Sequence, residues 1–179
     1  NLNTGRPALY AVGTSTASLA FGGPGNHNES WNGSAWTELN NLNTSRSDLS
    51  GAGTTTAALA YGGESGLTNT ENFNGTSWTE VNDLSGGIFG GWGSGISTSA
   101  LLYGGKTPAP AFTTKAEIFD GTSWAETGSM ATAITQSGGS VGGTGTTALQ
   151  AGGDNADGYK DTTQEFSTEN FVTKTFDTD

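Results

Sequence analysis

The sequence predicts an all-β fold, a β-propeller built from four four-stranded units. Two patterns recur along the chain. The first is a double glycine at positions 22–23, 62–63, 104–105 and 152–153, which subtraction places 40, 42 and 48 residues apart. The second is a glutamate followed seven positions later by tryptophan, at positions 29 and 36, 71 and 78, and 117 and 124. Repeats of this period indicate stacked supersecondary units rather than one irregular domain.

The repeats place unit boundaries at about 1–40, 41–82, 83–128 and 129–179, within a single domain covering 1–179. A four-stranded unit of this size cannot bury both faces of its sheet alone. Stacked radially, its neighbours cover both faces and leave only short protected edges. Because the repeat boundaries nearly coincide with the ends of the sequence, an open arc of the same four units is an alternative to a closed ring.

The second unit illustrates the expected strands. We expect strands at Leu49–Gly53, Ala57–Tyr61, Glu71–Phe73 and Trp78–Val81. The second of these is nearly continuously apolar, which is typical of a strand buried on both faces. Asn74-Gly75 predicts a tight hairpin because both residues tolerate positive φ. No stretch keeps the i, i+3, i+4, i+7 apolar spacing of a helix.

Equivalent turn residues recur in the other units. A turn glycine precedes each double glycine by nine residues, at Gly13, Gly53, Gly95 and Gly143. The hairpin signal is Asn32-Gly33 in the first unit and Asp120-Gly121 in the third. The fourth unit has Ser167-Thr168 there, and Gln164 and Phe171 replace its acid and tryptophan, as is common for terminal repeats.

The recurring acids and tryptophans are expected to be structural. Equivalent residues stand in different units, so Glu29, Glu71 and Glu117 cannot form a close catalytic pair. We expect each to hydrogen-bond to backbone. Trp36, Trp78 and Trp124 are expected to be buried between units, with a sugar-binding platform as the alternative.

Composition limits the partners. The chain has 6 basic and 17 acidic residues, a net charge of −11. Nucleic-acid binding needs a basic surface, so this balance argues against it. The chain has no cysteine, which rules out disulfides and thiolate chemistry. No apolar run approaches the ~20 residues of a membrane-spanning helix.

A strand ending in Gly-Gly, a variable loop, an acid, an aromatic two residues later and tryptophan seven after the acid together resemble the kelch repeat. Arg6 and Arg46 also lie where that repeat often carries arginine. The resemblance covers essentially the whole chain and implies a kelch-type propeller. The third and fourth units lack the arginine. The Thr-, Ser-, Asn- and Gly-rich composition is similar to that of kelch-like segments in bacteriophage virion proteins.

Cofactor chemistry is not expected. Galactose oxidase has a kelch-type propeller, and its copper site needs several His and Tyr ligands and a Cys–Tyr cross-link, whereas this chain has only His27 and no cysteine. Asp154, Asp157 and Asp161 form a calcium candidate, since hard cations prefer several oxygens on a flexible loop. Their spacing differs from an EF-hand loop, because Ala156 takes a ligand position, so a polar turn is the alternative.

The loops after the double glycines differ in length and are expected to share one face with the links between units. Insertions on one face of a repeat array often mark a binding surface. We therefore expect partner-binding residues on this face, with ordinary solvated loops as the alternative. The candidates are Lys106, Phe112, Lys115, Tyr159 and Lys160.

These observations predict a non-enzymatic structural or attachment module of a bacteriophage, in a tail, fibre or decoration protein. Its location would be the virion or another extracellular site. Its expected partners are other virion subunits or a host surface glycan, and homo-oligomerisation is open. The alternatives are an extracellular carbohydrate-active enzyme of propeller type and an intracellular kelch scaffold that binds a peptide.

Overall fold

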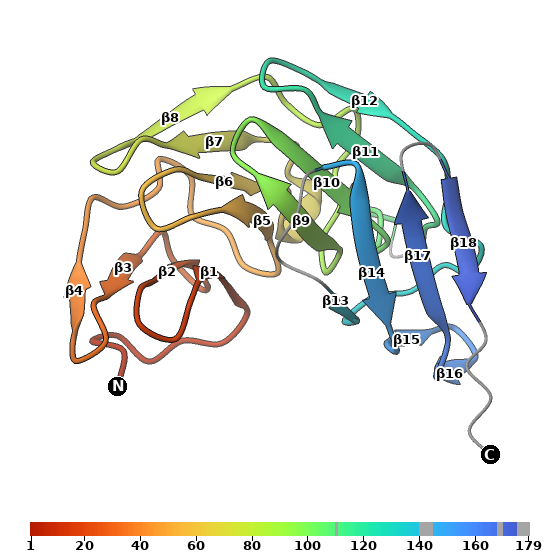
Figure 1. Cartoon of the computed structure of the whole chain (residues 1–179), viewed down its shortest axis with the longest axis horizontal. Helices are drawn as coiled ribbons and strands as arrows, with labels where there is room; N and C mark the ends of the chain where they lie inside the picture. Colours follow the sequence, from red (N-terminus) through yellow and green to blue (C-terminus); the bar gives the residue numbers. More distant parts are fainter. Residues whose placement is uncertain (110, 140–144, 168–169, 175–179) are drawn as a thin grey trace.

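Four antiparallel four-stranded sheets are arranged as a four-bladed β-propeller, as predicted (Figure 1). The computed structural model describes residues 1–109, 111–139, 145–167 and the backbone of 170–174. Two positions of the predicted turns, Gly143 and Thr168, lie outside the described residues. Among the described residues, no helix has the length and apolarity needed to cross a membrane.

Each blade is a meander of neighbouring strands. Blade 1 contains β1 (Leu9–Gly13), β2 (Ser18–Gly22), β3 (Asn28–Trp31) and β4 (Trp36–Glu38), and blade 2 contains β5 (Ser50–Gly53), β6 (Ala58–Tyr61), β7 (Thr70–Phe73) and β8 (Trp78–Val81). Blade 3 contains β9 (Trp92–Ile96), β10 (Ser99–Tyr103), β11 (Ala116–Phe119) and β12 (Trp124–Glu126). Blade 4 contains β13 (Gly138–Gly139), β14 (Thr147–Ala151), β17 (Thr163–Ser167) and β18 (Asn170–Lys174).

Two short elements lie in the loops. A 3₁₀ turn, η1 (Glu64–Gly66), follows the double glycine of blade 2. A separate hairpin of β15 (Asp154–Asn155) and β16 (Gly158–Tyr159) interrupts blade 4. The sequence indicates only a loop there, because two-residue strands are too short to show alternation.

The predicted hairpin turns are confirmed. In blade 2, Oδ1 of Asn74 accepts hydrogen bonds from the amides of Thr76 and Ser77, at 2.9 and 3.0 Å. Gly75 follows with φ of 93°, a conformation that a side chain disfavours. The carboxylate of Asp120 makes the same two contacts in blade 3, at 2.8 Å each.

The core lies between the blades. Three clusters of buried apolar residues join blades 1 and 2, blades 2 and 3, and blades 3 and 4. In each junction, the earlier blade contributes what we call its forward face and the later blade its rear face. The second strands supply both, because alternate residues point to opposite sides: in β6, Leu59 and Tyr61 point forward, whereas Ala58 and Ala60 point to the rear.

The tryptophan prediction is confirmed in two of three blades. On the rear face of blade 2, the Trp78 ring centroid lies 5.1 Å from that of Phe21 in blade 1. Trp124 lies 4.7 Å from Tyr61 in the same way, and its Nε1 donates to the Thr70 hydroxyl at 2.9 Å. The prediction for Trp36 is wrong. Trp36 is half-buried, because it belongs to the rear face of the first blade, where no earlier blade covers it.

A backbone ladder joins the blades through the residues Ala8, Asp48, Gly90 and Gln136, each of which lies just before the first strand of its blade. The amide of Asp48 donates to the Ala8 carbonyl at 3.0 Å, Gly90 donates to Asp48 at 2.8 Å, and Gln136 donates to Gly90 at 3.3 Å. All four have positive φ, between 50° and 62°. This conformation is uncommon for non-glycine residues, so the ladder holds three of them in a conformation that is costly alone.

The four blades form an arc in which blades 1 and 4 stand at opposite ends (Figure 1). No cluster of buried apolar residues within the described part of the chain joins these two blades. The open arc that the sequence left as an alternative is therefore the observed form.

Candidate functional site

The loops after the second strands and the links between blades lie on one face of the propeller, which we call the loop face. Backbone hydrogen bonds connect them: Arg46 donates to the Gly25 carbonyl at 3.1 Å, and Glu64 donates to Ser47 at 2.9 Å. This arrangement confirms the prediction that loops and links share a face.

A buried ion pair anchors the loop face in blade 2. Nη2 of Arg46 lies 2.7 Å from Oε1 of Glu71, and both side chains are fully buried. Glu71 also accepts hydrogen bonds from the amides of Asn43 and Thr44, at 2.7 and 3.1 Å. Nη1 of Arg46 donates to the Asn69 carbonyl at 2.6 Å. The glutamate thus has the structural role that its repetition predicts.

The positions equivalent to Arg46 and Glu71 are stabilised differently in the other blades. Blade 1 repeats the arginine–glutamate pair with Arg6 and Glu29. In blade 3 the arginine position holds the buried Ile88. The missing cation is replaced by Lys115, which lies just before β11. Its Nζ lies 3.2 Å from Oε1 of Glu117, as an ion pair without hydrogen-bond geometry.

Blade 4 has neither charge. Ile134 takes the arginine position and is buried, and Gln164 takes the glutamate position. Its Oε1 accepts the amide of Ala131 at 2.8 Å, and its Nε2 donates to Gln150 at 3.1 Å. Loss of the cation is therefore matched by loss of the anion, as expected when a buried charge needs a partner.

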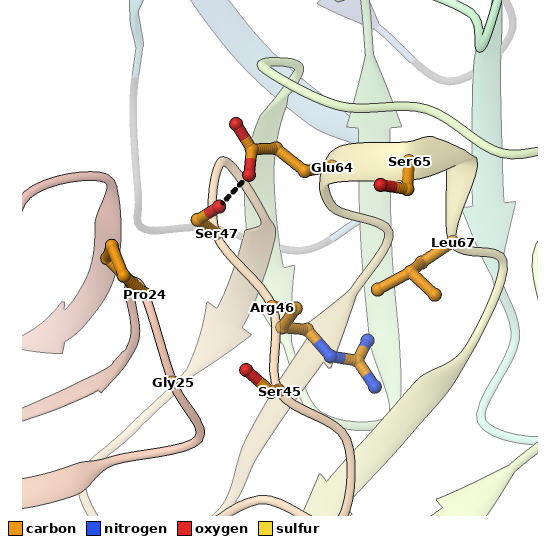
Figure 2. A pocket seen from close by; sticks show the side chains of 8 residues that line it. All are labelled: Pro24, Gly25, Ser45, Arg46, Ser47, Glu64, Ser65 and Leu67. Atoms are coloured by element: carbon orange, nitrogen blue, oxygen red, sulfur yellow. Dashed lines mark hydrogen bonds between the residues drawn. The ribbon is translucent and has the colours of Figure 1, made fainter.

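A pocket of about 320 Å³ opens on the loop face between blades 1 and 2. Figure 2 shows Ser45 and Ser47 on the link that enters blade 2, with Pro24 and Gly25 across the hollow. The Ser47 hydroxyl donates to Oε2 of Glu64 at 2.5 Å. Ser65 and Leu67 complete the lining on the η1 side.

Arg46 forms the buried back of this pocket. It is 3% exposed, and its Nε has no hydrogen-bond partner among the described residues. An unpaired buried donor is costly, and this one belongs to a residue that lines the pocket. The pocket therefore combines serine hydroxyls and one carboxylate with an apolar edge at Leu67, and the Arg46 guanidinium is buried behind this lining.

A carboxyl pair stands at the edge of the pocket. Burial raises the pKa of Asp48, and the charge and hydrogen bond of neighbouring Glu64 raise it further, against the opposing effect of Lys106. Asp48 itself lines a smaller pocket of about 130 Å³ beside the central ladder, together with Tyr10 and Trp92.

The structure divides the predicted contact residues into three groups. Lys106 and Phe112 lie together, with Nζ of Lys106 4.5 Å from the ring centroid. Tyr159, which is 95% exposed, and Lys160 belong to the β15–β16 hairpin and the residue after it. Lys115 instead turns toward blade 3, where it also reaches Oε1 of Glu126 at 3.0 Å.

The calcium candidate gains no support from the geometry. Within the described residues, no three His, Cys, Asp or Glu side chains are grouped to hold a metal ion, and this covers Asp154, Asp157 and Asp161. Asp157 lies 3.8 Å from Lys160. His27 is half-buried in the first loop.

The pocket was missed by sequence reasoning, which favoured basic and aromatic loop residues. Its lining comes from the serines flanking Arg46 and from Glu64-Ser65, none of which repeats in the other blades. The sequence signal that could have found the pocket is the departure from the repeat in the link that enters blade 2, where serines flank Arg46. The charge of the loop residues does not indicate it.

Comparison with known proteins establishes the fold only. No protein-family model matches the chain, and no curated protein matches it. The solved "Structure of YjhT" aligns with a TM-score of 0.79 at 11% sequence identity. The alignment covers 97% of this chain and 66% of that one. At this identity the likeness shows a shared propeller fold, and the chain spans less than two thirds of the length of that protein.

Proposed function

We propose that this protein is a non-enzymatic binding module of a phage particle, in a tail, fibre or decoration protein, and that it holds a host surface glycan in the pocket between blades 1 and 2. The observation that supports the proposal is the lining of that pocket, in which serine hydroxyls and a carboxylate surround a hollow on the loop face.

This lining suits a polyhydroxylated ligand. Sugar hydroxyls donate and accept hydrogen bonds, as do Ser45, Ser47 and Ser65, whereas the Glu64 carboxylate only accepts them. Leu67 offers an apolar surface to the C–H groups of a sugar ring. The volume of about 320 Å³ lies at the small end of the ~300–1,000 Å³ common for ligand sites, a size that suits a short glycan segment.

Binding is favoured over hydrolysis by the carboxyl geometry. Glycoside hydrolases generally keep their two carboxyl groups about 5–9.5 Å apart, with the scissile bond between them. Glu64 raises the pKa of Asp48 as a direct neighbour, so we infer that these carboxyl groups are too close together to take a glycosidic bond between them. The pair therefore supports a positioning role rather than acid–base catalysis.

The virion role rests on the resemblance of composition to phage kelch-like segments. It makes a neighbouring virion subunit the second candidate partner, for which the exposed Tyr159 and the Lys106–Phe112 pair are the expected contacts.

A glycan array printed with bacterial surface polysaccharides tests the proposal. The wild-type chain should bind a subset of the glycans, and Glu64→Gln should reduce that binding at least tenfold, since a charge-assisted hydrogen bond of about 1.5–3 kcal/mol is lost. Thr56→Ala, at an exposed turn between β5 and β6, is the matched control and should bind as wild type. Glycan binding that is unchanged in Glu64→Gln would refute the pocket, and absence of binding to all printed glycans would favour the virion-subunit partner.

A further inference from the structure

Each junction between blades contains an aromatic residue packed against a glycine. The aromatic comes from the second strand of the earlier blade and the glycine from the first strand of the later one. The three pairs are Phe21 with Gly51, Tyr61 with Gly93, and Tyr103 with Gly139. A Cβ added to these glycines would lie only 2.7, 2.4 and 2.5 Å from the respective aromatic side chain. The aromatic therefore requires the glycine.

The two faces at the ends of the arc depart from this rule together. On the rear face of blade 1, the glycine position is Ala11, whose methyl group is incompatible with an aromatic packed in that way. On the forward face of blade 4, the aromatic position is Ala151. Both alanines are exposed. Each change would break an ordinary junction, but the two are compatible with each other.

Apolar side chains remain on both end faces. Leu149 of blade 4 is 44% exposed, whereas its equivalents Leu19, Leu59 and Leu101 are 0% exposed. On blade 1, Trp31 and Trp36 form a tilted pair with centroids 5.6 Å apart, and both are half-buried. The equivalent pair in blade 2, Phe73 and Trp78, is 0% and 5% exposed. Trp31 is larger than its equivalent Phe73, and Ala151 is smaller than the aromatic residues at its position in the other blades, so the two changes compensate in volume.

The backbone ladder also supports a junction between these two end faces. Within the described residues it starts with the Ala8 carbonyl and ends with the Gln136 amide, so the Ala8 amide and the Gln136 carbonyl stand at its two ends. The amide belongs to the blade that carries Trp31, and the carbonyl belongs to the blade that carries Leu149. A junction between these blades would continue the ladder in its existing direction.

These two faces cannot meet within one chain in this structure, because they lie at opposite ends of the arc (Figure 1). We propose that the rear face of blade 1 binds the forward face of blade 4 of a second copy, head to tail. Such a contact is heterologous, so it forms a closed ring when the rotation per chain divides a full turn and an extended chain otherwise.

Two complementary variants test the proposal. Ala11→Lys blocks the rear face of blade 1, and Leu149→Lys blocks the forward face of blade 4; both side chains are exposed, so neither change should unfold the protein. Sedimentation velocity is measured at a physiological ionic strength of ~0.15 M, which screens repulsion between chains of net charge −11 each. Wild type should associate as its concentration rises, and each variant alone should remain monomeric.

Mixing the two variants is the decisive step. Each retains one functional face, so the mixture should contain a 1:1 dimer of twice the monomer mass, with reduced acrylamide quenching of tryptophan fluorescence. A variant that dimerises alone would show a face-to-itself contact and overturn the proposal. Wild type that stays monomeric up to its solubility limit, or a mixture that stays monomeric when wild type associates, would also overturn it.

Discussion

The buried pair of Arg46 and Glu71 can be replaced with residues that the protein already uses elsewhere. Blade 4 has Ile134 and Gln164 at the two equivalent positions, both buried. We therefore consider Arg46→Ile, Glu71→Gln and the double variant, which gives blade 2 the same residue pair that blade 4 has. Blade 3 shows independently that isoleucine fits the arginine position, since Ile88 is 2% exposed.

The magnitudes follow from what each change leaves behind. Removing one partner of a buried ion pair costs about 3–5 kcal/mol, because the other charge stays buried and unpaired. Arg46→Ile should fall near about 3 kcal/mol, since the amides of Asn43 and Thr44 still stabilise the Glu71 carboxylate. Glu71→Gln should cost about 2–3 kcal/mol, since Arg46 keeps its carbonyl acceptors.

The double variant should lose only about 1–2 kcal/mol, well below the sum of about 5–6 kcal/mol for the single changes. A neutral amide at position 71 can still accept the two backbone hydrogen bonds, as Gln164 does for Ala131 and Thr132. Urea unfolding, followed by tryptophan fluorescence and far-UV circular dichroism, measures the free energy of each variant. Additive losses in the double variant would refute the claim that charge pairing, rather than the specific side chains, is what this position requires.

The remaining predictions concern packing and pH. Trp78→Ala should cost about 3–5 kcal/mol, whereas Trp36→Ala, on the uncovered rear face, should cost about 1–2 kcal/mol; equal losses in thermal unfolding would contradict the packing difference. Burial favours the protonated form of Glu29, but hydrogen bonds from Arg6 and Asn3 outweigh it and lower its pKa. Its contribution to stability is therefore present above the pKa of the unfolded chain and lost as pH falls through the lowered value, and Glu29→Gln should flatten that acid-side decline. For Asp48 the raised pKa gives the opposite sign: stability falls as pH rises through that value, so Asp48→Asn, which tolerates positive φ, should stabilise the protein near pH 7 and lose its advantage in acid.

The fold was predictable because its signals are local and repeated. A double glycine, an Asn-Gly turn and an alternating strand each have a mechanism that operates within a few residues, and four copies in phase remove the ambiguity of any one. The burial of Trp78 and Trp124 follows from the same repetition. Trp36 could not be separated from them, because its surroundings depend on a neighbouring blade and not on its own segment.

The candidate site was less predictable because its geometry depends on contacts between units. Ser45, Ser47 and Glu64 are ordinary loop residues in sequence, and only the packing of one link against two loops brings them to one hollow. Lys115 shows the converse error. It lies in the same loop as Lys106, but its ammonium group pairs with Glu117, whose usual arginine partner is absent from blade 3.

Loop length explains why a hollow opens between blades 1 and 2. The first loop, 24–28, is the shortest of the four, and the third, 106–116, is the longest. At the next junction, between blades 2 and 3, the longer loop brings Pro108 against Gly66, where an added Cβ would lie 2.2 Å from the proline ring. That contact brings the two loops together at this junction. The first loop is too short to make such a contact, so Pro24 and Gly25 remain across the pocket from Glu64 and Ser65 (Figure 2). The same variation in loop length that leaves the blades unchanged thus leaves the hollow between blades 1 and 2 open.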